Sequence, residues 1–291
     1  MTILPFAIVD VFASKPLSGN PLAVVMDADE LADTQLQAIA HEFNQSETTF
    51  VMRPRQAGAR RRLRSFTASG AEVAGAGHNA LGAWWWLVNS GHETAGHLRQ
   101  ELGGRLLDLD VTRIGNALEV RMRQAAPIAG AELPAGELAP ALGIGADRLD
   151  GGNAQVISTG TPHLLIAARD RQAVDAAEPN AGDLAAKLAR CGGQGAYLYA
   201  VEGTGRAYAR FFNPTVGLFE DPATGSAAGP LAWLLSRGQR GRATVLVEQG
   251  HALGRPSTIA VDVDGDTVTL VGSAVISAEG ALHIDDSEER A

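Results

Sequence analysis

The most informative segment of the chain reads Glu220-Asp221-Pro222-Ala223-Thr224-Gly225-Ser226-Ala227. An apolar run with leucines at helical spacing follows it, over residues 228–235. A loop that leads into the N-terminus of a helix presents unpaired N–H groups and the positive end of the helix dipole. The segment therefore predicts an anion site. The alternative is a plain helix cap, with Thr224 or Ser226 as the N-cap residue.

A second segment matches this one at an offset of about half the chain. Gly77-His78-Asn79-Ala80 precedes an apolar run over 81–87, and aligning Gly77 with Gly225 places His78 on Ser226. Three more pairs of segments keep a similar offset and the same order. They are 18–22 with 159–163, 64–67 with 210–213, and 100–103 with 247–250. Four ordered pairs indicate two similar halves of about 145 residues, a usual domain size.

Both halves hold short runs of β-branched and apolar residues, which predict strands. Each half also holds one apolar helix rich in small residues, and the first covers 81–88. A helix that is apolar nearly all round is usually surrounded by other structure. The sequence therefore predicts a strand-rich α+β protein in which a curved sheet closes around such a helix. Asp33 is the predicted N-cap of a further, amphipathic helix.

Composition narrows the possible functions. The 291 residues are 45% hydrophobic, enough for two buried cores. The formal net charge is −9 and no long basic run occurs, so we expect no nucleic-acid partner. The longest apolar run, 80–88, is too short to span a bilayer, and residues 1–12 do not resemble a signal peptide.

Cysteine and histidine usage bears on location and on metals. Cys191 is the single cysteine of the chain, so no intrachain disulfide can form, which favours the cytoplasm. No His or Cys pair has the spacing of a metal site. We therefore expect neither a metal nor a structural zinc ion.

Six segments of the chain resemble segments of a known family, both in sequence and in their order along the chain. The segments are 9–12, 18–25, 44–51, 76–78, 220–227 and 249–257, and they span nearly the whole chain. The most specific parts are Ser18-Gly19-Asn20-Pro21, Ser46-Glu47-Thr48-Thr49-Phe50 and the acidic loop at 220–227. Together they resemble the PhzF-like family, which is named for the phenazine-biosynthesis isomerase and has the diaminopimelate-epimerase-like fold.

The resemblance implies two pseudo-symmetric halves, each an open β-barrel wrapped around a central helix. It places the active site in the cleft between them. The predicted N-terminal half covers residues 1–125 and the C-terminal half covers 126–277, with a C-terminal strand at about 278–291 returning to the first half. Proteins of this family are commonly homodimers, so the resemblance also implies a homodimer.

The two halves differ at the position of Glu47, which carries a carboxylate in the first half only. With the half-chain offset it aligns close to Gly195, so the first half has an acid at a strand start where the second half has none. A glutamate after a helix is most often simply solvated. The resemblance instead makes Glu47 the general acid/base that carries the proton. Partial burial favours that role, because it raises the pKa of a carboxyl towards the operating pH.

Two further residues complete the predicted catalytic set. His78, at the start of the apolar helix, could bind substrate through a hydrogen bond or relay a proton. It could also merely cap the helix. Asp221 could hold the tautomer of that histidine or stabilise its charge. Alternatively, its negative charge only interacts favourably with the positive end of the helix dipole.

The remaining candidates are predicted to contact a small-molecule substrate. They are Gly77, Asn79, Thr224, Gly225 and Ser226. The glycines let the backbone approach a ligand closely, and Ser226 offers a hydroxyl or a plain helix cap. If the two helix N-termini face one cleft, their N–H groups could hold a substrate carboxylate and the negative charge that develops during reaction.

The reaction class depends on the lack of a second base. Epimerases of this fold usually use two cysteines, and the corresponding positions here hold Ala76 or Gly77 and Thr224 or Gly225. One carboxylate acting on one face suits an isomerase of a small unsaturated carboxylate without a cofactor. The prototype of the family isomerises trans-2,3-dihydro-3-hydroxyanthranilate. An epimerase or racemase of a small acid and a non-catalytic binding protein remain alternatives.

Three positions depart from the pattern that is usual in the family. Ala68 and Ala74 stand where proline is common, and Asn79 stands where alanine or proline is usual. All three flank the predicted pocket. They therefore bear on the identity of the substrate more than on the fold.

Overall fold

The protein is described by a computed structural model, which covers residues 1–215, 219–238 and 241–285. The chain divides into two compact units. Unit 1 combines residues 1–121 with the residues from 273 onwards, and unit 2 comprises residues 122–272. None of the helices in the described ranges is long and apolar enough to cross a bilayer.

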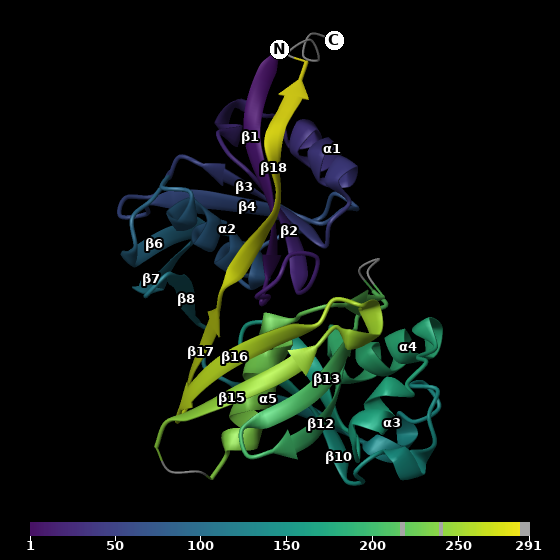
Figure 1. Cartoon of the computed structure of the whole chain (residues 1–291). Coiled ribbons are helices and arrows are strands. Elements are labelled where there is room, and N and C mark those ends of the chain that lie inside the picture. The colour runs from purple at the N-terminus through teal and green to yellow at the C-terminus, as the bar shows by residue number, and fades with distance from the viewer. Residues whose placement is uncertain (216–218, 239–240, 286–291) are drawn as a thin grey trace. The chain divides into compact units, whose positions relative to one another are not determined.

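Unit 1 is a sheet built around one buried helix. Its elements are β1 (Thr2–Val11), β2 (Asn20–Val25), a 3-10 turn (Ala28–Glu30), α1 (Asp33–Phe43), β3 (Glu47–Met52), β4 (Arg61–Phe66), β5 (Glu72–Val73), α2 (His78–Asn89), β6 (Gly96–Leu102), β7 (Arg105–Ile114), β8 (Ala117–Arg123, which runs into unit 2) and β18 (Ala274–Ile284). Strand β18 lies antiparallel beside β1 (Figure 1). The last part of the predicted return strand, 286–291, falls outside the described residues.

Unit 2 contains the remaining strands and three helices. Its elements are β9 (Ile128–Pro134), β10 (Asn153–Ser158), β11 (Pro162–Ala167), α3 (Arg171–Asp175), α4 (Ala181–Cys191), β12 (Gly195–Gly203), β13 (Arg206–Phe212), β14 (Glu220–Asp221), α5 (Gly225–Ser236), β15 (Ala243–Gln249), β16 (Ser257–Asp264), β17 (Thr267–Gly272) and 3-10 turns at Ala135–Glu137, Ala146–Arg148 and His251–Leu253.

The same series of strand pairings occurs in both units. In unit 1, β2 pairs with β3 in parallel, β3 with β4 antiparallel, β4 with β6 in parallel and β6 with β7 antiparallel. In unit 2, the series β11, β12, β13, β15 and β16 repeats these directions. The short strands β5 and β14 pair with β4 and β13 in the same register. The prediction of a sheet-rich α+β fold is confirmed.

The apolar helices have the environment that their sequences predict. Residues 78–88 of α2 are all buried, and the helix packs against β1, β2 and β3. Helix α5 packs in a similar way against β10, β11 and the strands β15 to β17. A helix with no polar face is stable in a globular protein only when it is surrounded in this way.

The predicted N-cap of α1 is wrong by one residue. Ala32 occupies the N-cap position, and its backbone N–H donates to Oε1 of Gln35 at 2.9 Å. Asp33 is already helical, and its carboxylate accepts a hydrogen bond from Arg64 at 2.6 Å. Asp33 therefore contacts β4 through Arg64, while Gln35 satisfies the N–H of the N-cap residue, as the third residue of a capping box does.

Candidate active site

The predicted site residues of unit 1 lie where α2 begins. Gly77 is the N-cap residue, and its N–H donates to Oδ1 of Asn79 at 2.7 Å. The Asn79 amide donates to the carbonyl oxygen of Gly75 at 2.9 Å and to Oγ of Ser65 at 3.1 Å. Asn79 is fully buried. Its amide therefore fixes the turn that presents His78, and its contacts within the described residues are structural.

His78 is buried at the first position of α2. It is 8% exposed, and its Nε2 has no hydrogen-bond partner among the described residues. Burial lowers the pKa of His78 to about 4, because desolvation penalises the imidazolium ion. The ring is therefore neutral at pH 7, and a neutral imidazole can donate one hydrogen bond and accept another.

Glu47 is the first residue of β3 and is half-buried. In the parallel pairing with β2 it lies opposite Leu22. Helix α2 packs against β3, so the elements that carry Glu47 and His78 contact each other. The following strand residues extend a polar cluster into the unit, in which Thr49 and Ser65 share a hydrogen bond of 2.8 Å between their hydroxyls.

The acidic loop of unit 2 is held by Gln249 at the end of β15. The Gln249 amide donates to the carbonyl oxygen of Asp221 at 2.7 Å and to Oγ1 of Thr224 at 3.0 Å. Its oxygen accepts the Thr224 N–H at 3.2 Å and the Tyr197 hydroxyl at 2.8 Å. Gln249 is fully buried. It therefore determines the path of the loop from β14 into α5.

Thr224 stands at the N-cap position of α5, but its hydroxyl does not cap the helix. The hydroxyl donates instead to Oδ2 of Asp221 at 2.5 Å. The carboxylate of Asp221 is thereby oriented from inside its own loop. The preceding residue, Glu220, forms two hydrogen bonds of 2.8 Å with Arg210. This bidentate pair anchors the loop to β13.

Ser226 has a partner that the sequence analysis missed. Its Oγ lies 3.0 Å from Nε2 of His163, a buried residue of β11. The sequence signal for His163 is its position in the segment 159–163, which repeats 18–22 with histidine in place of Leu22. Gln249 was likewise visible only as part of a repeated segment. Neither pattern alone indicates a contact with the acidic loop.

The predicted residues thus form two groups. Gly77, His78 and Asn79 are consecutive, and Glu47 is on the neighbouring β3. Asp221, Thr224, Gly225 and Ser226 form the second group at the start of α5. The described residues contain no group of three or more His, Cys, Asp or Glu side chains that could hold a metal ion.

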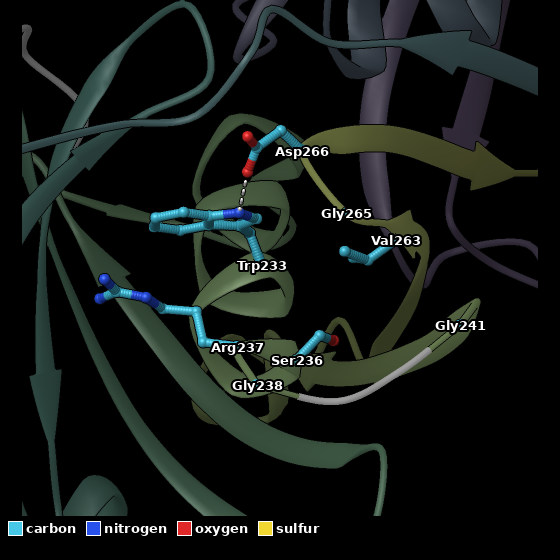
Figure 2. Close-up of a pocket in the computed structure, with 8 residues that line it drawn as sticks. All are labelled: Trp233, Ser236, Arg237, Gly238, Gly241, Val263, Gly265 and Asp266. Carbon is cyan, nitrogen blue, oxygen red and sulfur yellow. Dashed lines mark hydrogen bonds between the residues drawn. The ribbon is translucent and has the colours of Figure 1, made fainter.

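Two hollows in the described residues have other linings. One, of about 220 Å³, lies beside the last turn of α5 in unit 2, whereas Ser226 is in its first turn. Figure 2 shows Trp233 there, donating to Asp266 at 3.0 Å, with Arg237 against its ring. The other, of about 420 Å³, lies in unit 1 and is lined by β4 and β6 residues that include Arg62 and Glu101. None of the predicted site residues lines either hollow.

A family model described as phenazine biosynthesis-like protein, PhzC-PhzF, matches residues 9–280. The chain belongs to the PhzC-PhzF family. A curated relative from Pseudomonas chlororaphis is named trans-2,3-dihydro-3-hydroxyanthranilate isomerase. It is 34% identical to the present protein, and the alignment covers 95% of the present chain and 98% of the relative.

Two solved structures extend the comparison. A predicted epimerase from Pseudomonas aeruginosa has 33% identity and a TM-score of 0.84, with 97% of this PhzC-PhzF protein and all of that chain covered. A hydroxyproline epimerase from Agrobacterium vitis has 12% identity and a TM-score of 0.66, with 98% and 94% covered. The second likeness shows a shared fold alone.

Proposed function

We propose that this protein is an isomerase that moves a proton within a small unsaturated carboxylate and needs no cofactor. The substrate class that we propose is that of trans-2,3-dihydro-3-hydroxyanthranilate. Curated relatives at 34%, 35% and 32% identity carry the name of that isomerase. The relatives and the chemistry of the site residues support the same reaction class.

A single observation carries the proposal. Glu47 provides a half-buried carboxylate at the start of β3, whereas the matching position of β12 is Gly195. One carboxylate can remove a proton from one carbon and return it to another on the same face of the substrate. An epimerase needs bases on opposite faces, and the loop positions for a pair of thiols hold Ala76, Gly77, Thr224 and Gly225.

The other residues receive supporting roles in the proposal. His78 is neutral and buried, so it can hydrogen-bond the substrate without adding charge. Asp221, oriented by Thr224, can hold an imidazole or a substrate amine. The N–H of Gly77 already donates to Asn79, so the backbone N–H groups and the hydroxyl offered to the substrate are those of Gly225 and Ser226 at the start of α5. Such groups favour a carboxylate and the negative charge of a transition state.

The proposal includes the arrangement that the sequence predicts. Units 1 and 2 would be pseudo-symmetric halves, each an open barrel around its apolar helix. The repeated series of strand pairings supports this pseudo-symmetry. A homodimer and a cytoplasmic location are further parts of the proposal. For location, the support is the single cysteine, Cys191.

The test is to incubate the protein with trans-2,3-dihydro-3-hydroxyanthranilate in D₂O and follow the products by NMR. An isomerase gives a product with a moved double bond and a proton or deuteron at a new carbon. Exchange with inversion at a stereocentre and no moved double bond would indicate an epimerase instead. Binding in a thermal-shift assay without turnover or exchange would indicate a binding protein and contradict the proposal.

A further inference from the structure

His163 lies directly behind the hydroxyl of Ser226. Its Nε2 is 3.0 Å from Oγ of Ser226. His163 is 3% exposed, whereas Ser226 is half-buried and keeps part of its surface in contact with solvent. Ser226 therefore has more of its surface open to a ligand than His163 has.

The packing around His163 fixes its ring. Phe211 meets the imidazole edge to face, with ring centroids 5.0 Å apart. Phe211 in turn contacts Tyr197, whose hydroxyl is bound to Gln249. Gly195 makes room for this arrangement, because a Cβ atom there would lie 2.3 Å from Cζ of Phe211. The ring has little freedom to move away from Ser226.

The environment of the second ring nitrogen determines the tautomer. Nδ1 of His163 is buried and has no hydrogen-bond partner within the described part of the chain. Buried N–H groups without an acceptor are rarer than buried acceptors without a donor. The tautomer with hydrogen on Nε2 is therefore favoured, since it leaves only a lone pair on Nδ1 unsatisfied. Burial also lowers the pKa of His163 to about 3, so the ring stays neutral.

We propose that His163 is a positioning residue that donates to Ser226 and thereby directs the serine hydroxyl proton towards the anionic group of the substrate. With Nε2–H as donor, Oγ of Ser226 acts as acceptor and its own proton remains available. This inference rests on the proposed function, because it assigns the group that Ser226 would bind. It adds a buried residue of β11 that contacts no substrate itself.

The test compares two substitutions at His163. His163→Leu removes the donor and installs the residue found at the matching position of unit 1, Leu22. His163→Gln keeps an N–H near the position of Nε2. We expect His163→Leu to raise KM by about tenfold with little change in kcat, as for loss of a uniform binding contact, and His163→Gln to recover most of the affinity. Equal effects of both variants would contradict positioning through the donor.

A double-mutant cycle isolates the route through Ser226. In a Ser226→Ala background, His163→Leu is expected to have almost no further effect on KM, because the hydroxyl that it positions is absent. Additive effects would show that His163 acts by another route and would overturn the inference. If His163→Leu does not fold, the tautomer of the His163 ring in the wild-type protein still decides.

A measurement without substrate separates this inference from the proposed function. Long-range ¹H–¹⁵N spectra of the histidine rings report the tautomer, and His163→Gln identifies the signal by its loss. We expect an Nε2–H ring at pH 7 whose shifts change in Ser226→Ala. An Nδ1–H ring would overturn the inference even in an active isomerase. Absence of turnover in the wild-type protein, with the Nε2–H ring observed, would overturn the proposed function instead.

Discussion

The two units have the same strand pairings but carry different chemistry at one matched position. Where β2 and β3 pair in unit 1, Leu22 lies opposite Glu47. Where β11 and β12 pair in unit 2, His163 lies opposite Gly195. The acid of one unit corresponds to a glycine in the other, and the aliphatic residue corresponds to a histidine. The strand pairing is thus the same in both units, and the residue types at these two positions decide that unit 1 carries the acid and unit 2 the histidine.

The strand residues that follow Glu47 and Gly195 explain why more than one residue differs between the two units. Behind Glu47, the pair Thr49 and Ser65 is hydrogen-bonded. At the matching register of unit 2, Tyr197 lies opposite Phe211, and the Phe211 ring occupies the space that a side chain at position 195 would need. A carboxylate at the start of β12 would therefore require a smaller residue at 211 as well.

The largest expected effect tests the acid of unit 1. Glu47→Gln keeps the shape and hydrogen-bonding capacity of the side chain but cannot carry a proton. We expect kcat to fall by about 10²–10⁴-fold, the range for general acid–base groups. The melting temperature should stay close to that of the wild type. Turnover of trans-2,3-dihydro-3-hydroxyanthranilate measures the rate. A near-wild-type rate with intact folding would show that Glu47 is not the proton carrier.

The matching ion pairs of the two units provide the second test. Arg210 and Glu220 have side chains 10% and 11% exposed, whereas Arg64 and Glu72 are 18% and 46% exposed. Breaking a buried pair leaves a charge uncompensated, so Glu220→Gln should lower the free energy of unfolding by about 3–5 kcal/mol. Glu72→Gln should cost at most about 1 kcal/mol, because that pair is solvated and Arg64 keeps Asp33.

Urea denaturation of both variants measures this contrast. The Glu72→Gln protein serves as the matched control, since the two glutamates occupy the same register opposite Phe66 and Phe212. Equal losses would mean that the difference in burial has no energetic consequence. The repeated ion pair would then act alike in both units.

The third test concerns the glycine of unit 2. Gly195→Ala forces a methyl group against the Phe211 ring, and overpacking of this kind costs about 1–3 kcal/mol. In a Phe211→Leu background the ring is absent, so the same substitution should cost less. Chemical denaturation of the four proteins measures the coupling. Equal costs in both backgrounds would indicate that space for Phe211 is not the reason for the glycine.

Local patterns predicted a substantial part of this structure. The small apolar segments after Gly77 and Gly225 indicated α2 and α5, because a helix without a polar face must be buried. The half-chain offset also aligned Glu47 with Gly195, a register that the parallel strand pairs reproduce. These features depend on periodicity and repetition, which a single sequence records directly.

Contacts between distant segments were less accessible. His163 meets Ser226 across 63 positions of the chain, and Gln249 meets Thr224 across 25. The partner of a polar side chain depends on tertiary packing, which sequence spacing does not encode. The same limit explains the error at Asp33, since Arg64 engages its carboxylate from another element. Sequence patterns located the segments, but the hydrogen bonds that orient them required the structure.

The last prediction concerns acid stability and is measured as a slope of unfolding free energy against pH. Burial lowers the pKa of His78 to about 4 and that of His163 to about 3. The unfolded chain binds a proton at each histidine below about pH 6.5, while the folded protein does not. Stability contributed by the neutral rings is therefore fully present above pH 6.5 and is lost as the pH falls towards 4. Each histidine adds a slope of up to about 1.4 kcal/mol per pH unit.

We expect His78→Gln and His163→Gln to have flatter profiles of unfolding free energy between pH 6.5 and 4 than the wild type. The exposed His283→Gln is the control and should follow the wild-type slope. Carboxylates also titrate in this range, so the informative quantity is the difference between variant and wild type at each pH. Parallel profiles for all four proteins would show that neither ring is held neutral, and the Nε2–H donor assigned to His163 would then lose its support.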